Sequence, residues 1–508
     1  MPSTSPTLGG PRTAPAPPRQ TRPRTRLLAL AGCLLALVAI GVAVWQLATS
    51  PAETPVTPFK TFHSEPSLDP DGLTVAVAAH DTAPGFVFLA VKRGPGQDGP
   101  MITDNRGRVV WFHPVPDGDT ATAFKVQQYR GRPVLTWWQG HTRLGHGNGE
   151  YIVMNTEYRV IARVRSVDAP LPDHHDFQLL PDGNALMTLY SEKPADLSAV
   201  GGPRDGTLID SRFQEVNVAT GRLVWQWRAS KHVPVTEGMT APKQDKPHDY
   251  FHINAINQER DGNFLISARN THAVYEISRR TGSILWRLGG KRSGFKLGPG
   301  ASFAFQHDVR RQPDGTITMF DNEATPAKAD QSRGIQLRLN MSAMTATLVR
   351  QWRHPDRLLV GAEGNVQTLP NGDVFTSWGQ QGHISELTRD GRLLFDLVVP
   401  HGSDSYQAFR SPWRGRPLTR PAVAAHRGAD GRTTVWASWN GATNVRRWRV
   451  VAGDRRGHLK PIGRPVRRAG FETALTVQTH APLVAVRAIG VGGRALKASR
   501  AIAPTGVR

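Results

Sequence analysis

The stretch Leu180-Pro181-Asp182-Gly183-Asn184 decides the fold of this chain, because the same kind of turn recurs along the sequence. An Asp-Gly or Asn-Gly pair between two strand-like runs is a strong β-hairpin signal, since glycine accepts the positive φ that such turns need. The other examples are Arg260-Asp261-Gly262-Asn263, Pro313-Asp314-Gly315-Thr316 and Pro370-Asn371-Gly372-Asp373. A hairpin that recurs in this way indicates a repeated β-structure.

A second repeated element is a glycine turn followed by a short apolar strand that ends in an aromatic residue. It occurs at residues 106–111, 220–225, 281–286 and 390–395. Trp111 and Trp225 are 114 residues apart, about twice the following interval of 61, so a further unit is expected between them. Five to six repeated units of this length, each with four short strands, predict an all-β fold in the form of a β-propeller.

The expected propeller covers residues 70–455. Its blades are expected at about 73–113, 120–166, 173–228, 250–289, 304–353 and 361–399. A strand pair at 433–439 and 445–451 is expected to close the ring or to complete a blade. Alternating runs at 474–478 and 483–489 predict a small C-terminal β appendage within residues 456–508.

The N-terminal part differs in composition from the rest. Residues 1–26 contain five Arg and no acidic residue, and their Pro, Ser and Thr content predicts a disordered basic tail. Residues 27–48 form an uncharged apolar run, long enough for a transmembrane anchor because about 20 residues span a bilayer. A cleaved signal near Ala48-Thr49-Ser50 and acylation of Cys33 are the alternatives. Residues 49–69 predict a Pro-rich linker.

This N-terminal pattern predicts a location. Basic residues on the N-terminal side of a span lie in the cytoplasm, so the expected topology is a single-pass protein of the cell membrane with an extracytoplasmic body. The formal charge of +22 does not predict nucleic-acid binding, because arginine is scattered and no basic stretch alternates with stacking aromatics. The single cysteine, Cys33, excludes an intramolecular disulfide and a cysteine metal site.

Three histidines lie at nearly the same phase of the hairpin repeat. His175 and His307 each precede their turn glycine by eight residues, and His252 precedes its own by ten. Tyr190, Arg269, Asn322 and Gly379 follow the turn glycines by seven. Such positions are cross-strand neighbours at the hairpin end away from the turn. If the hairpins are blades around one axis, these side chains meet at one mouth.

Three imidazoles and a guanidinium favour an anionic ligand. Three histidines can hold zinc, but Arg269, across the hairpin from His252, would repel a dication. Sulfate and phosphate esters are instead bound well by guanidinium and imidazole N–H groups. A neutral imidazole can also act as a nucleophile. The residues therefore predict sulfuryl or phosphoryl transfer without a metal. Asp176 and Asp308 directly follow two of the histidines, but strand neighbours face opposite sides, so a relay within each pair is not expected.

Several segments resemble the signature regions of the arylsulfotransferase (ASST) family. They are Asp249-Tyr250-Phe251-His252-Ile253-Asn254-Ala255-Ile256, Leu265-Ile266-Ser267-Ala268-Arg269, Phe305-Gln306-His307-Asp308 and His175-Asp176-Phe177. Ala437-Ser438-Trp439-Asn440-Gly441-Ala442-Thr443 is similar to the branch found in actinomycetes and fungi. The resemblance extends from about Gly85 to Val451.

The resemblance implies a six-bladed propeller that moves a sulfuryl group from one phenol to another without a nucleotide sulfate donor or other cofactor. It implies that His307 carries the group covalently, that His252 and Arg269 hold the sulfuryl oxygens, and that His175 assists. Tyr190 and Asn322 are the expected substrate-binding residues. The partners implied are an aryl sulfate and a phenol. The oligomeric state does not carry over, because the N-terminal β-domain of the bacterial enzymes is missing.

Two other functions remain open from the sequence. A membrane-tethered propeller without catalysis could bind a ligand or a cell-surface polymer through its loops. A quinone-dependent dehydrogenase would also fit a propeller with repeated strands ending in Trp, although these tryptophans are expected to pack between blades.

Overall fold

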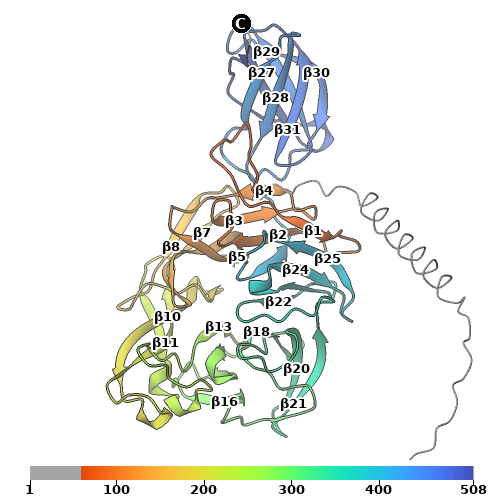
Figure 1. Ribbon diagram of the computed structural model, residues 1–508. Helices are drawn as coiled ribbons and strands as arrows, with labels where there is room; N and C mark the ends of the chain where they lie inside the picture. The colour runs from red at the N-terminus through yellow and green to blue at the C-terminus, as the bar shows by residue number, and fades with distance from the viewer. Residues whose placement is uncertain (1–58, 507–508) are drawn as a thin grey trace, which may run out of the picture. The chain divides into compact units, whose positions relative to one another are not determined.

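The computed structural model describes residues 59–506 as strands, loops and single turns of 3-10 helix (Figure 1). Among these residues no helix is both long and apolar enough to cross a bilayer. The expected basic tail, the apolar segment 27–48 and most of the Pro-rich linker lie outside the described range. The all-β class predicted from the hairpin turns is confirmed.

Six antiparallel sheets form a propeller-like ring, with four strands of each following one another from the centre outward. The first is β26 (Ala408–Ser411), β2 (Phe86–Val91), β3 (Gly99–Thr103) and β4 (Val109–Phe112). The second is β5 (Thr120–Tyr129), β6 (Arg132–Arg143), β7 (His146–Met154) and β8 (Val160–Val164). The third is β9 (Phe177–Leu179), β10 (Asn184–Ala195), β11 (Gly206–Asn217) and β12 (Leu223–Arg228).

The other three sheets continue in chain order. The fourth is β13 (Ile253–Gln258), β14 (Phe264–Ala268), β15 (Ala273–Ile277) and β16 (Ile284–Gly289). The fifth is β18 (His307–Arg311), β19 (Ile317–Asp321), β20 (Arg333–Asn340) and β21 (Thr345–Trp352), with β17 (Lys296–Leu297) at its edge. The sixth is β22 (Asn365–Thr368), β23 (Val374–Ser377), β24 (His383–Leu387) and β25 (Leu393–Val398), with β1 (Thr74–Val77) at its edge.

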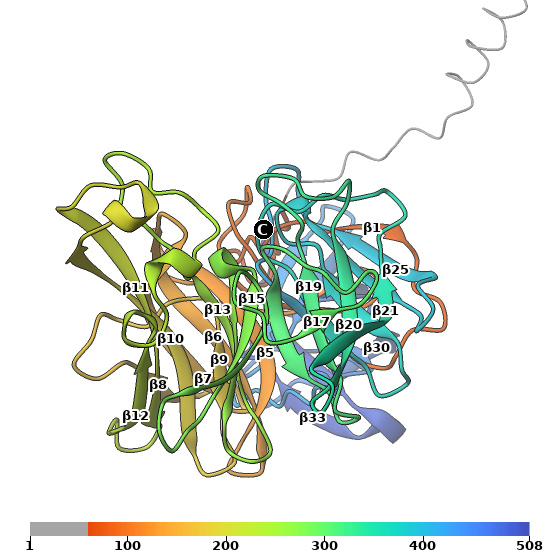
Figure 2. The ribbon, with the colours of Figure 1, turned by 90° about the horizontal axis from the view of Figure 1, so that it is seen from below.

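The six sheets form a closed cycle. The innermost strands contact one another in the order β26, β5, β9, β13, β18 and β22, and β22 contacts β26 again. In Figure 1 the sheets are seen around their common centre, and Figure 2 shows the strands from the side. Two strand pairings close the ring. At its N-terminal side β1 extends the sixth sheet, and at its C-terminal side β26 supplies the inner strand of the first sheet. Strand pairing across the closure protects sheet edges that would otherwise be open.

The four predicted hairpin turns have the expected backbone. Gly183, Gly262, Gly315 and Gly372 have φ between 82° and 90°, the left-handed region that favours glycine. Each glycine N–H donates to the carbonyl of the residue three positions earlier, for example Gly315 to Gln312 at 3.0 Å. These turns join the two innermost strands of the third to sixth sheets.

Apolar side chains pack between neighbouring sheets. One cluster joins Trp138 and Tyr151 of the second sheet to Phe177 and Leu189 of the third, all of them buried. The aromatic residues that end the outer strands also contribute, because Trp111 and Trp286 are buried in such clusters. Aromatic burial of this kind stabilises the ring and supports the packing role expected for the tryptophans.

Residues 422–506 build two further sheets (blue in Figure 1). One contains β27 (Ala422–Arg427), β28 (Arg432–Ser438), β31 (Glu472–Gln478) and β34 (Thr505–Gly506). The other contains β29 (Arg447–Gly453), β30 (Lys460–Arg467), β32 (Leu483–Ile489) and β33 (Ala495–Ala498). Their inner faces share one apolar core around Trp448, Val435 and Val486.

This pair of sheets differs from the sequence-based expectation. Residues 433–439 and 445–451 were expected to close the ring or complete a blade, but they form most of β28 and β29 in the two C-terminal sheets. The boundary expected at residue 455 therefore falls between β29 and β30 of one sheet. The physical reason is the short strand β26, which closes the ring in their place.

Six single turns of 3-10 helix complete the described chain: η1 (Ser198–Val200), η2 (Ala229–Lys231), η3 (Val235–Glu237), η4 (Arg269–Thr271), η5 (Gly379–Gln381) and η6 (Val491–Gly493). Only η4 contributes to the site described below, because it begins with Arg269.

Candidate functional site

The three predicted histidines lie where innermost strands begin. His175 precedes β9, His252 directly precedes β13, and His307 is the first residue of β18. The structure brings His175 and His252 into contact, with 3.0 Å between their Nε2 atoms. The ring of Tyr406 lies beside both His175 and His307, with centroids 5.6 and 6.3 Å away. The shared phase of the repeat therefore places the three imidazoles in one cluster.

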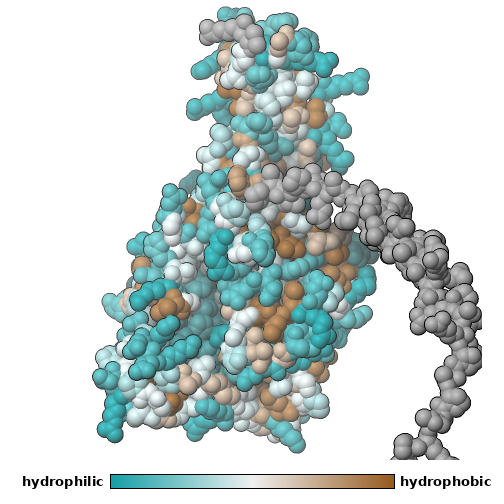
Figure 3. Space-filling model, in the orientation of Figure 1, coloured by the Kyte–Doolittle hydropathy of each residue, from teal (hydrophilic) through white to brown (hydrophobic). Residues whose placement is uncertain are grey.

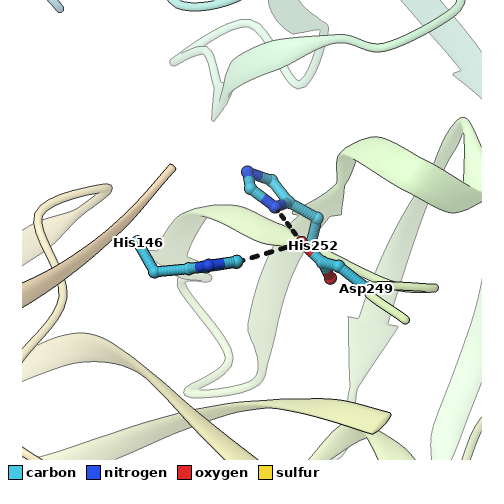
Figure 4. Close-up of side chains that lie close together, drawn as sticks. All are labelled: His146, Asp249 and His252. Carbon is cyan, nitrogen blue, oxygen red and sulfur yellow. Dashed lines mark hydrogen bonds and ion pairs between the residues drawn. The ribbon is translucent and has the colours of Figure 1, made fainter. Parts of the chain in front are cut away.

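Two carboxylates hold the Nδ1 atoms of the paired histidines. His175 Nδ1 bonds to Asp173 Oδ2, and His252 Nδ1 bonds to Asp249 Oδ2. The same Asp249 oxygen is 3.0 Å from Nε2 of His146, at the start of β7, and Figure 4 shows both imidazoles converging on it. Asp176, which directly follows His175, instead pairs with Arg310 at 2.7 Å. The absence of a relay between sequence neighbours, expected from strand alternation, is therefore observed for this pair.

The backbone at these strand starts is strained. His252, Phe305 and Glu363 have φ of 58°, 57° and 72°, in the left-handed region that non-glycine residues rarely occupy. Such conformations cost about 1 to 3 kcal/mol each and persist where the surrounding structure enforces them. They hold His252 and the residues around His307 in place.

His307 is 2% exposed and is held by Asn322, in the loop after β19. Its Nδ1 lies 2.7 Å from Asn322 Oδ1 and 3.1 Å from the carbonyl of Phe305. The amide orientation of Asn322 is fixed, because its Nδ2 donates to the carbonyls of Val360 and Glu363. With two acceptors next to it, Nδ1 carries the proton and Nε2 has the lone pair. That Nε2 accepts a 3.3 Å bond from the Glu363 backbone N–H.

Electrostatics keep His307 neutral. Burial lowers its pKa well below the usual value, and the positive charge of Arg269 acts in the same direction, while the hydrogen bond to Asn322 opposes it. Arg269 donates to the Gly361 carbonyl at 3.0 Å and to Asn270 Oδ1 at 2.9 Å, and its guanidinium lies over the Phe305 ring. No carboxylate pairs with it among the described residues. Arg269 therefore adds an unneutralised positive charge beside His307.

The neighbouring groups have pKa values shifted in different directions. Burial lowers the pKa of His252 to about 4, with His175 and His146 adding to the effect and Asp249 opposing it. Burial would raise the pKa of Asp249, but His252 and His146 lower it well below its usual range, so this carboxylate is ionised. Burial also opposes ionisation of His146, yet its bond to Asp249 raises its pKa.

Tyr190 lies on β10 beside this cluster. Its ring centroid is 4.3 Å from that of His146 and 5.6 Å from that of His175, while its hydroxyl donates to the Ile253 carbonyl. Burial raises the pKa of Tyr190 well above the usual value, so it is neutral. A cavity of about 230 Å³ is lined by His146 and Tyr190 of the cluster and by Ile209, among other residues, but not by His175, His252 or His307.

Sequence reasoning missed several members of the cluster. His146, Asp173, Asp249 and Tyr406 are named above, and Glu363 forms an ion pair with Lys92 at 2.6 Å. Tyr406 precedes β26 by two residues, as His175 precedes β9, so it has the same phase in the repeat. This signal was hidden because β26 follows the last blade in sequence but belongs to the first. Gly379, the fourth residue at the forward offset, opens η5 and brings no side chain.

Some of these residues could also ligate a metal. His146, Asp249 and His252 form one group of possible ligands, and Asp173, His174 and His175 form another. In the first group one carboxylate oxygen already bonds both imidazoles, which is typical of a hydrogen-bonded charge cluster. Arg269, which lowers the pKa of His307, also adds positive charge to this region.

The fold and site together define an all-β, propeller-like protein with a histidine–carboxylate cluster at the inner strand ends. The arylsulfotransferase (ASST) family model matches residues 125–399. The chain therefore belongs to the arylsulfotransferase family, and this membership suggests aryl sulfotransferase activity. The match includes all six site residues predicted from the sequence.

Solved structures show weaker similarity. A protein of unknown function from Bacteroides caccae is 15% identical, with 64% of this chain and 98% of that chain covered and a TM-score of 0.40. A protein of unknown function from Dyadobacter fermentans is 12% identical, covering 65% and 93%, with a TM-score of 0.35. A catalytically inactive virginiamycin B lyase from Staphylococcus aureus is 11% identical, covering 74% and 93%, with a TM-score of 0.28. A search of curated proteins gave no match.

Proposed function

We propose that this protein transfers a sulfuryl group from a phenolic sulfate ester to a phenolic acceptor, through a sulfohistidine at His307 and without a nucleotide sulfate donor. The observation that carries the proposal is the hydrogen bond between His307 and Asn322, which fixes the tautomer of the imidazole. Asn322 Oδ1, 2.7 Å from Nδ1, fixes the tautomer that puts the lone pair on Nε2, where attack on sulfur replaces the 3.3 Å bond from the Glu363 N–H. The lowered pKa keeps that imidazole unprotonated at neutral pH.

In the first half-reaction, His307 Nε2 attacks sulfur, the N–S bond forms, and the bond between sulfur and the phenolic oxygen breaks. The leaving phenolate then takes a proton. In the second half-reaction the acceptor phenol gives up its proton, its oxygen attacks sulfur, and the N–S bond breaks. Negative charge on the sulfuryl oxygens is stabilised by Arg269 and by the Glu363 backbone N–H, 3.3 Å from Nε2 of free His307.

The pair His175–His252 is suited to move that proton. Both Nδ1 atoms face carboxylates, so both carry hydrogen. The contact of 3.0 Å between the two Nε2 atoms is then a hydrogen bond only if one of them is also protonated. Because burial lowers the pKa of His252 to about 4, its Nε2 is the base that accepts the proton of the acceptor phenol, and solvent water protonates the leaving phenolate. Tyr190 and the cavity beside it offer an aromatic wall for a phenol ring.

The first test uses His307→Ala. We expect transfer from 4-nitrophenyl sulfate to phenol to fall by at least about a thousand-fold, because the covalent carrier is lost. Brief exposure of the native protein to 4-nitrophenyl sulfate should add one sulfuryl group to its intact mass. His354→Ala, which replaces a histidine outside the cluster, should keep that adduct. Native transfer activity without any adduct, or full activity in His307→Ala, would contradict the covalent route.

A second experiment tests whether Asn322 fixes the tautomer of His307. Asn322→Leu removes the acceptor for His307 Nδ1–H, and we expect kcat to fall about 100-fold with a smaller change in KM. Incubation with a chelator should leave activity unchanged, because no step uses a metal. Loss of activity on chelation, with recovery on adding a divalent metal, would instead favour a metal role for the histidine–carboxylate groups.

The cellular setting also remains a proposal. We propose that residues 27–48 anchor the protein in the cell membrane with residues 59–506 outside the cytoplasm, on the strength of the uncharged 22-residue run and the arginines before it. Segment 437–443 supports assignment to the branch found in actinomycetes and fungi. Protease accessibility of the ring in intact cells would test the topology, and resistance to added protease would contradict it.

A further inference from the structure

A pocket rich in arginine lies between β4 and the two C-terminal sheets. None of its residues belongs to the histidine cluster. It has a volume of about 400 Å³ and is lined by Arg108, Arg446, Arg447, Arg467 and Arg468. Asp104 is the only acidic residue in its lining. A pocket of this size holds a ligand larger than a single small ion, since ligand sites measure about 300 to 1,000 Å³.

The charges of this pocket are not balanced within the described chain. Asp104 is already paired with Arg108 at 2.6 Å. Arg468 donates to the carbonyls of Gly470 and Ala442, which carry no charge. Within residues 59–506, no carboxylate lies within ion-pair distance of Arg446, Arg447 or Arg467. Burial lowers the pKa of Arg468 to about 10; Asp104 opposes this shift, and the charges of Arg108 and Arg446 add to it.

The same excess of positive charge continues along the neighbouring sheet. Arg447 on β29 lies directly opposite Arg467 on β30, and Arg449 on β29 lies directly opposite Arg487 on β32. Like charges directly opposite one another destabilise a sheet. The strands β29, β30 and β32 contain no Asp or Glu that could offset them. These strands therefore carry an excess of positive charge that their own residues do not offset.

Spacing and residue type indicate the chemistry of the ligand. Strands lie about 4.8 Å apart, so the arginines of β30, β29 and β32 extend over roughly 10 Å, farther than one sulfate or phosphate reaches. Guanidinium groups bind sulfate and phosphate oxygens in a bidentate manner, which lysine cannot do. Figure 3 shows hydrophilic side chains projecting from the C-terminal sheets on the face in view.

We propose that the arginine pocket and the adjoining face of β30, β29 and β32 bind an anionic polymer that carries repeated sulfate or phosphate groups. One charged group enters the pocket between Arg108, Arg446 and Arg468. The next groups along the polymer contact Arg447 and Arg467, and then Arg449 and Arg487. A recessed pocket suits a chain that can enter it better than a flat lipid surface. This inference does not depend on the proposed sulfuryl transfer.

The experiment compares two double variants of the full chain that lose the same charge. Arg447→Gln with Arg467→Gln removes one opposed pair, and the matched control, Arg132→Gln with Arg222→Gln, removes two exposed arginines of the ring. Binding to heparin and to polyphosphate is measured at several salt concentrations. We expect the first variant to bind about tenfold more weakly or worse and to show a shallower salt dependence, and the control to change by less than about twofold.

Further arms separate the possible sources of the anion. Arg447→Lys with Arg467→Lys keeps the charge but loses the bidentate geometry, and it should fall between the native protein and the glutamine variant. Equal weakening in the control would show that binding follows net charge alone and would overturn the proposal. If inorganic sulfate displaces heparin at the same concentration of negative charge, the pocket binds small anions and the polymer proposal is overturned. Binding only to vesicles with anionic phosphatidylglycerol would replace the polymer with a lipid surface. Thermal unfolding of every variant identifies any loss of fold.

Discussion

At the scale of single residues, the arrangement around His307 depends on its neighbours more than on the histidine itself. Asn322 fixes its proton, and Arg269 together with burial keeps it neutral. Asp173 and Asp249 orient the pair His175–His252, since each carboxylate accepts a hydrogen bond from an Nδ1–H and leaves the Nε2 atom facing the other imidazole. The cluster therefore offers one neutral imidazole, His307, as nucleophile and another, His252, as proton acceptor.

This arrangement predicts an unusual pH dependence. The lowered pKa of His307 means that its Nε2 stays unprotonated below pH 6.5, the usual histidine pKa. We expect kcat/KM for sulfuryl transfer to stay level from pH 8 down to about pH 6 and to fall only below that. A pH–rate profile of the purified protein measures this, and an acid limb centred near the ordinary histidine pKa would contradict it.

The same groups also affect stability, with a definite sign. His252 has a folded-state pKa of about 4, below its unfolded value, so the unfolded chain takes up its proton first as the pH falls. The folded state is therefore destabilised progressively below about pH 6.5. His252→Gln removes this effect, so the loss of Tm between pH 7 and pH 5 should be smaller in the variant. An equal loss in both proteins would show that His252 does not contribute.

At the scale of elements, each of four inner hairpins depends on a glycine turn. The strands on either side place a cluster residue at the far end, so the turn sets the register that aligns His307 near Asn322. At Gly315 the φ is 82° and no atom lies within 4 Å of an added Cβ. A substitution there therefore tests the backbone conformation alone.

We expect Gly315→Ala to lower the free energy of unfolding by about 1 to 2 kcal/mol, because alanine is disfavoured in the left-handed region. Gly315→Asn should cost less, since asparagine tolerates that conformation. Gly294→Ala, at a glycine without a positive φ, serves as the control. Chemical denaturation measures all three. Equal losses for Ala and Asn at position 315 would argue against the turn as the cause.

At the scale of the whole ring, side-chain amides join the first and last sheets. Asn365 on β22 donates to the Ala408 carbonyl and accepts from its N–H, both at 2.9 Å. Gln367 makes the same pair of hydrogen bonds with the backbone carbonyl and N–H of Arg410. These bonds fasten the short strand β26, and with it Tyr406, to the sixth sheet.

Asn365→Leu should therefore destabilise the ring by about 2 to 4 kcal/mol, because two backbone groups of Ala408 lose their buried partners. We expect a matching loss of hydrogen-exchange protection in β26. Gln128→Leu replaces an exposed amide on another inner strand and should change stability by less than about 0.5 kcal/mol. If both variants unfold at the same denaturant concentration, the amide bonds do not secure the closure.

The sequence alone predicted the all-β class, and it predicted which histidines would lie close together. The positive φ required by Gly183, Gly262, Gly315 and Gly372 is a local property, so the hairpins were visible without coordinates. Repetition then placed His175, His252 and His307 at one phase, and the structure brings them together around Tyr406. The position of Arg269 was predicted by counting residues from the turn glycine, because the register of a hairpin depends only on residues close in sequence.

Only the tertiary structure decided how the ring closes and which carboxylates serve the histidines. β26 pairs with β2, more than 300 residues earlier in the chain, and no local pattern encodes a pairing over that distance. His146 reaches Asp249 across 103 residues for the same reason. The opposed arginines of β29, β30 and β32 likewise become neighbours only when the strands pair. Turns are set by nearby backbone sterics, whereas these contacts depend on the packing of whole sheets.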